Sequence, residues 1–132
     1  MKARYHAMVS IVLALPFIYT GRFYTGLMCF LFGVFMDVDH EIDFFVEYRR
    51  FTLSAFDLSD GLLERSLCII PLHSIEFVIL LGILSRIYPC LIGGVIGVSV
   101  HLFFDGAINR MKPFSPFFIY RAINNFRRDA TF

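Results

Sequence analysis

Four apolar stretches follow one another along the chain, and their spacing predicts four helices arranged as two hairpins. Very short polar links, TGR and SR, join the first stretch to the second and the third to the fourth. A helix needs about 20 mostly apolar residues to cross a bilayer, a length that these stretches approach when the polar residues at their ends are counted. On that count the helices extend over residues 6–20, 22–40, 66–85 and 87–105.

Composition agrees with a membrane location. The chain is 58% hydrophobic with a mean hydropathy of +0.70, which exceeds the apolar share of ordinary soluble domains. At 132 residues it has the size of one domain. The three cysteines lie in apolar stretches without CxxC spacing, which disfavours a disulfide or a cysteine zinc site. We therefore expect one all-α integral membrane domain over residues 1–132, a bundle of four transmembrane helices.

The basic residues fall almost entirely on one face of the expected bundle. Alternating helices return the long connection after the second helix, and the C-terminal tail, to the side of the N-terminus. That side then carries every Lys and Arg except Arg22 and Arg86. Because positive residues are retained in the cytoplasm, both termini are expected there. The basic start of the first segment also fits a secretory signal, but no small-x-small cleavage site follows it.

Ionisable residues interrupt the apolar pattern at one membrane level, on the basic side. All four histidines lie at this level, together with aspartates. Asp37 and His40 are i and i+3, and His101 and Asp105 are i and i+4, so each pair can share a helix face. Buried carboxylates are costly in an apolar bundle unless a cation neutralises them. Imidazoles and carboxylates bind Zn²⁺, with Mn²⁺ or Mg²⁺ as alternatives. The predicted metal ligands are His6, Asp37, Asp39, His40, His73, His101 and Asp105.

Simpler interpretations of the same residues compete with the metal site. His6 alone fits an interfacial polar residue, and the MDVDHEID run fits a solvated helix end. His101 and Asp105 fit a single structural hydrogen bond. The common depth of the four histidines favours the metal site over these separate explanations.

Two carboxylates near the predicted ligands are candidate catalytic bases. Asp39 lies beside the pair formed by Asp37 and His40, and Glu76 follows His73 at i+3. A divalent ion with an open coordination position activates water and polarises a phosphoryl or carbonyl oxygen, and a nearby carboxylate can take the proton. Glu76 fits equally well as a ligand or as the hydrogen-bond partner of one.

The C-terminal tail, over residues 110–128, mixes basic and aromatic side chains. Such a segment fits an amphipathic stretch lying on the anionic cytoplasmic leaflet. Arg110 and Lys112 follow Asp105 closely, and either could also bind a substrate phosphate at the metal site. Basic residues interleaved with so many phenylalanines fit a membrane surface better than a nucleic acid, so no nucleic-acid partner is expected.

Two further patterns concern packing rather than chemistry. Gly93 and Gly97 form a GxxxG spacing, which indicates a close helix contact. In the connection before the third helix, FDLSDGLLERS predicts a turn and a short amphipathic helix whose acids are solvated.

The polar motifs resemble those of a bacterial and archaeal family described as membrane-bound metal-dependent hydrolases. They are the Asp-x-Asp-His at 37–40, the His-Ser at 73–74, the His-x-x-x-Asp at 101–105 and the early His6. One branch of that family is associated with regulation by the LexA repressor. The family commonly carries an additional His-Arg and a Thr before the His-Ser, where this chain has LCIIPL. The resemblance implies a metal-dependent hydrolase in the inner membrane, with the number of ions left open.

These observations give an expected function and an alternative. The expected function is hydrolysis of a phosphoester in a lipid or lipid-linked substrate, since a site at the membrane level can receive a polar head while the tails stay in lipid. The alternative is a non-enzymatic membrane protein, either stapled by its metal or transporting an ion or proton. Transport is disfavoured because ionisable residues are confined to one end of the helices.

Overall fold

The structure is a computed structural model that describes residues 3–40, 45–46, 49, 68–109, 111–127 and 129. The amphipathic helix predicted in the acidic connection, and Arg110, lie outside the described residues.

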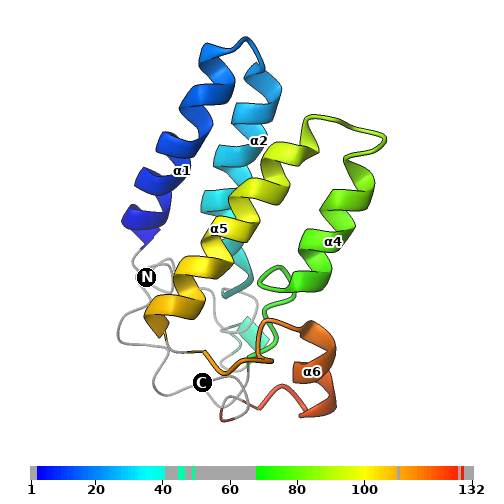
Figure 1. Ribbon diagram of the computed structural model, residues 1–132. Helices are drawn as coiled ribbons and strands as arrows, with labels where there is room; N and C mark the ends of the chain where they lie inside the picture. Colours follow the sequence, from blue (N-terminus) through cyan, green and yellow to red (C-terminus); the bar gives the residue numbers. More distant parts are fainter. Residues whose placement is uncertain are drawn as a thin grey trace.

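The described elements are helical, as the sequence predicts (Figure 1). Their order is α1 (Ala3–Tyr19), α2 (Phe23–Val34), the 3₁₀ turn η1 (Phe35–Asp37), α4 (Ile75–Leu84), α5 (Leu91–Asn109) and the short α6 (Phe118–Ile123). Residues 38–40 continue in helical conformation after η1, so the second predicted helix is observed in three consecutive pieces.

The helices form the two expected hairpins, with both turns at the same end of the bundle (Figure 1). The turn between α1 and α2 contains Gly21, whose positive φ of 77° is a conformation that glycine adopts without a steric penalty. Helix α5 packs against both α2 and α4, and α1 packs against α2. The start of α1, the end of α5 and α6 lie at the opposite end from the turns (Figure 1).

Glycines allow α5 to approach α2 closely. A Cβ atom added at Gly93 would lie 1.9 Å from the main-chain oxygen of Thr25, and one at Gly97 would lie 2.4 Å from that of Cys29. These contacts involve main-chain atoms, which cannot rotate away. The GxxxG spacing therefore marks a close helix contact, as the sequence predicts.

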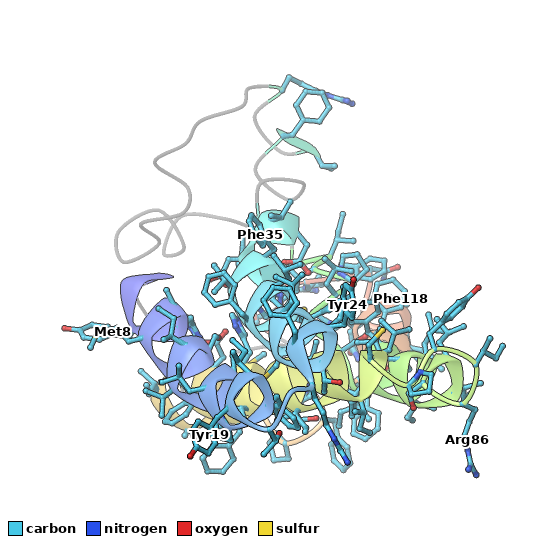
Figure 2. All side chains as sticks on the ribbon, turned by 90° about the horizontal axis from the view of Figure 1, so that it is seen from above. Met8, Tyr19, Tyr24, Phe35, Arg86 and Phe118 are labelled. Carbon is cyan, nitrogen blue, oxygen red and sulfur yellow. The ribbon has the colours of Figure 1, made fainter. Side chains whose placement is uncertain are left out.

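The bundle buries many polar side chains beside a small apolar core and exposes many large apolar ones. Among its buried residues are histidines, aspartates and an arginine, whereas large apolar side chains face outward. Met8, Val12 and Ile83 are 62%, 66% and 62% exposed. Figure 2 shows Met8, Tyr19 and Tyr24 projecting away from the helices that carry them. This distribution inverts that of an ordinary soluble core.

One of the described helices is long and apolar enough to cross a membrane, over Leu91–Ile108 in α5. The apolar stretches Tyr5–Tyr19 and Ile75–Leu84 are shorter.

Two predicted helix starts are wrong within the described part of the chain. The third helix, expected from residue 66, begins at Ile75, because Pro71 precedes it and Ser74 caps it. The Ser74 Oγ accepts from Phe77 N at 3.2 Å and donates to Pro71 O at 2.8 Å. The fourth helix begins at Leu91 instead of residue 87, and residues 85–90 form the turn. Proline at position 89 favours a start just beyond it, since its ring fixes φ and removes a donor.

Candidate metal centre

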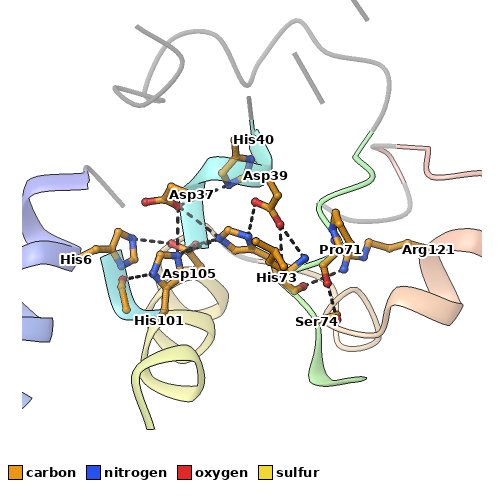
Figure 3. Close-up of polar contacts among 12 residues, drawn as sticks. His6, Asp37, Asp39, His40, Pro71, His73, Ser74, His101, Asp105 and Arg121 are labelled. Atoms are coloured by element: carbon orange, nitrogen blue, oxygen red, sulfur yellow. Dashed lines mark hydrogen bonds and ion pairs between the residues drawn. The ribbon is translucent and has the colours of Figure 1, made fainter. Parts of the chain in front are cut away.

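All seven residues predicted as metal ligands come together in one buried cluster (Figure 3). His6 comes from α1, Asp37 from η1, and Asp39 and His40 from the helical residues that follow. His73 lies on the loop before α4, and His101 and Asp105 lie one turn apart on α5. The cluster thus joins four segments that are distant in sequence.

Two overlapping groups of side chains have the arrangement of a metal-binding site. The first contains His6, Asp37, His101 and Asp105, and the second contains Asp37, His40 and His73. Within each group the potential ligand atoms lie within 4.8 Å of one another. Asp37 belongs to both groups, so its carboxylate could bridge two neighbouring ions.

The spacing of the ligand atoms suits a shared divalent ion. Two ligands bound tetrahedrally at zinc distances lie about 3.3 Å apart. His101 Nε2 lies 3.3 Å from Asp37 Oδ1 and 3.3 Å from Asp105 Oδ2, and His6 Nε2 lies 3.3 Å from Asp105 Oδ1. His73 Nε2 is 3.5 Å from Asp37 Oδ1 and 3.6 Å from Asp105 Oδ2. The His40 contact to Asp37 is longer, at 3.9 Å.

In His101 and His73, the ring nitrogen that points away from the cluster contacts an oxygen atom. His101 Nδ1 lies 2.9 Å from the main-chain oxygen of Gly33, which can only accept, so Nδ1 carries the proton of this contact. His73 Nδ1 lies 2.8 Å from Asp39 Oδ1, within ion-pair distance but without the geometry of a hydrogen bond. In His101 the lone pair is then on Nε2, which faces the cluster. Metal-ligating histidines are usually oriented in this way by a carbonyl or a carboxylate.

The closest contact in the cluster is between two imidazole nitrogens. His73 Nε2 and His101 Nε2 lie 3.0 Å apart. If both neutral rings hold their proton on Nδ1, two lone pairs face each other in a buried site and repel. The buried His6 Nε2 also makes no hydrogen bond within the described part of the chain, although Asp105 Oδ1 lies 3.3 Å from it. A cation bound between these nitrogens and the aspartates would remove both difficulties, so the donor set fits a divalent metal ion.

Asp39 belongs to the same buried cluster but to neither of the two ligand groups. Its Oδ1 faces His73 Nδ1, while its Oδ2 accepts from the main-chain nitrogens of Leu72 and His73 at 2.9 and 3.2 Å. The side chain is fully buried. Because both of its oxygens are engaged with the His73 loop, the structure places Asp39 as an orienting carboxylate, a different position from the ligand and base expected from sequence.

The other predicted catalytic and substrate residues lie apart from the cluster in the described structure. Glu76 accepts from Phe118 N and Ile119 N at 2.9 and 3.1 Å, so its carboxylate caps the start of α6. Lys112 donates to the main-chain oxygen of Asp129. Neither residue belongs to the two ligand groups.

Two residues that contact histidines of the cluster were not predicted from the sequence. Gly33 contributes only its carbonyl, which no side-chain pattern can reveal. Arg121 is fully buried and donates from Nη2 to the main-chain oxygen of His73 at 2.9 Å (Figure 3). In the sequence it is one of many basic residues in the tail, with no pattern that sets it apart.

Comparison of the chain with protein-family models, with curated proteins and with solved structures finds no match.

Proposed function

We propose that the protein is a membrane-embedded, metal-dependent hydrolase. The observation that carries this proposal is the pair of ligand groups that share Asp37, with His73 Nε2 and His101 Nε2 only 3.0 Å apart between them. Buried ionisable residues within an apolar bundle mark functional sites, because their burial is otherwise costly. The resemblance of the motifs to membrane-bound metal-dependent hydrolases supports the same conclusion.

In this proposal four helices cross the inner membrane of a bacterium or archaeon, with both termini in the cytoplasm. The outward apolar side chains of α1 and α4 support a lipid environment for helices that are short by length alone. Tilting or local thinning of the bilayer accommodates such short helices. The excess of basic residues that the sequence predicts on the side of the termini supports the orientation.

Zn²⁺ is the proposed ion, since neutral imidazoles and carboxylates at tetrahedral spacing suit it. When bound, it would supply activated water and polarise the oxygen of the scissile ester. His6, Asp37, His101 and Asp105 would hold one ion, and Asp37, His40 and His73 a second. Asp39, whose Oδ1 lies 2.8 Å from His73 Nδ1, would orient the His73 ring toward the ion. Asp39 and Glu76 both accept hydrogen bonds from main-chain nitrogens outside the ligand groups. Asp37 and Asp105 are therefore the carboxylates proposed to lie next to the bound substrate.

The proposed substrate is a phosphoester in a lipid or lipid-linked molecule. A cluster at the end of apolar helices lies at the level where lipid head groups lie, and the basic residues on that side favour an anionic head. The test is a panel of phospholipids, lipid-linked phosphates and carboxylic esters, incubated with metal-loaded protein and with His101→Ala as the control. Turnover above that control is expected for phosphoesters. If no substrate of the panel is hydrolysed, the ion would have only a structural role in stabilising the bundle.

Asp39→Asn is expected to weaken metal binding rather than to abolish it. An amide can still accept from the loop nitrogens but loses the negative charge that orients His73, and such changes cost about 10-fold to 100-fold in metal affinity. Hydrolysis by this variant should therefore recover as the metal concentration rises. His73→Ala, which removes a ligand, should not recover. Equal behaviour of the two variants would show that Asp39 is itself a ligand or the catalytic base.

The membrane topology gives an independent prediction. A reporter fused after Phe132 should be cytoplasmic, and one inserted between Thr20 and Arg22 should be external, because the basic residues concentrate on the side of the termini. Paired phosphatase and fluorescent-protein fusions measure both positions. An external C-terminus would contradict the cytoplasmic placement of the site.

A further inference from the structure

Arg121 is a charged side chain buried where it has few partners. It is 0% exposed, and its Nε and Nη1 make no hydrogen bond to the described residues. Within this part of the chain its guanidinium donates from Nη2 to the main-chain oxygen of His73, at 2.9 Å. The Phe118 ring lies on one side of it, with its centroid 5.8 Å from the guanidinium carbon. Burying a cation with few partners costs free energy, and a neutral residue would avoid that cost. The arginine at this position therefore indicates a role for its charge or its hydrogen bond.

The loop that carries His73 has no regular structure of its own to hold it. Residues 68–74 are not helical, and the helix begins only at Ile75. The direction of the His73 side chain therefore depends on what the backbone of the loop contacts. On one side, Asp39 accepts from the nitrogens of Leu72 and His73. On the other side, Arg121 donates to the oxygen of His73.

We propose that Arg121 is a positioning residue for His73, so that the C-terminal segment is a built part of the cluster. Asp39 and Arg121 hold the two peptide groups that flank the His73 Cα, one by its N–H and the other by its C=O (Figure 3). Fixing both groups sets the direction of the Cα–Cβ bond, and with it the place of Nε2. That nitrogen lies 3.0 Å from His101 Nε2 and 3.5 Å from Asp37 Oδ1, distances that a small rotation of the loop would change.

The rest of the C-terminal segment holds Arg121 in place through contacts with the same loop. The nitrogen of Ile75 donates to Pro116 O at 2.9 Å, and the nitrogen of Cys68 donates to Phe126 O at 2.8 Å. Glu76 caps α6 at Phe118 and Ile119. These contacts bracket the loop at both ends, so α6 and the loop are expected to move together.

The test compares three variants of the full chain in detergent micelles. Arg121→Gln removes the charge, Arg121→Lys keeps a cation that can still donate to His73 O, and Arg127→Gln is the matched control in the same segment. Arg127 is exposed and pairs with Asp129, whose Oδ2 lies 2.9 Å from its Nη2. One readout is the set of nitrogen–proton spectra of the four histidine rings in metal-free protein, and the other is titration with Zn²⁺.

We expect Arg121→Gln to change the ring resonances and the tautomer balance of His73 most, with a smaller change at His101, whose Nε2 lies 3.0 Å from His73 Nε2. Zn²⁺ binding to the group that contains His73 should weaken about 10-fold to 100-fold, the range typical of lost orienting contacts. Arg121→Lys should restore part of both effects, and Arg127→Gln should resemble the wild type.

Unchanged His73 resonances in Arg121→Gln would overturn the proposal. So would an equal change of all four rings together with a lower melting temperature, because that result describes a general loss of structure. The Zn²⁺ titration rests on the proposed function, whereas the nitrogen–proton spectra of the histidine rings do not. If the wild type binds no Zn²⁺, the hydrolase proposal fails and the spectra still decide the role of Arg121.

Discussion

Asp37→Ala is expected to remove all bound metal from the protein. Asp37 is the one side chain that belongs to both ligand groups, and its Oδ1 lies within 3.3 to 3.9 Å of His101, His73 and His40. Its removal therefore takes a ligand from each position and leaves the surrounding imidazoles without a bridging carboxylate. Metal content by elemental analysis, on protein purified in the presence of Zn²⁺, measures the effect.

Two single-group variants make this prediction sharper. His6→Ala touches only the first group, and His40→Ala touches only the second, so each should leave about half of the wild-type metal. Asp129→Ala is the control, because this aspartate is exposed and, within the described residues, contacts Arg127 and Lys112 of the tail. If His6→Ala and His40→Ala both lose all metal, a single ion shared by every ligand replaces the two-ion arrangement. If Asp37→Ala keeps the full amount of metal, the metal binds outside these two groups and the cluster is an ion-pair network.

The cluster itself was predictable because its members break a strong pattern. An ionisable residue in an apolar stretch is conspicuous, and the hairpin arrangement brings four such interruptions to the same end of the bundle. His101 and Asp105 could be paired from helix periodicity alone, and they do lie together, with 3.3 Å between His101 Nε2 and Asp105 Oδ2. The sequence therefore indicated both the composition of the cluster and its position at one end of the bundle.

The division of roles within the cluster was not predictable in the same way. His73 was expected on a helix, but it lies on a loop whose shape depends on Asp39 and Arg121, which are 34 and 48 residues away along the chain. Glu76 was expected near the metal, and it instead caps α6 from a separation of 42 residues. Periodicity reports only which residues share a local face. Contacts across such separations depend on how segments pack, which a single sequence does not encode in any local pattern.

The helix contact that supports the cluster gives the second large effect. Gly93→Val should destabilise the bundle by about 3 kcal/mol or more, because overpacking against rigid atoms forces a backbone shift. The added Cβ would meet the main-chain oxygen of Thr25 at 1.9 Å, and no side-chain rotation relieves that contact. Helix α2 leads into Asp37 and α5 carries His101 and Asp105, so separating these helices also pulls the ligands apart.

Matched glycines distinguish this effect from a general intolerance of larger residues. Gly82 lies in helix α4 and has nothing within 4 Å of an added Cβ, so Gly82→Val should cost less than about 1 kcal/mol. A Cβ added at Gly94 would lie 2.9 Å from the Phe32 ring, a side chain that can rotate. Substitution of Gly94 should therefore give an intermediate loss of stability. Thermal unfolding in detergent and metal content measure stability and site together. Equal stability of Gly93→Val and Gly82→Val would mean that α2 and α5 do not approach as closely in the membrane, and the ligand distances that depend on that approach would then have to be revised as well.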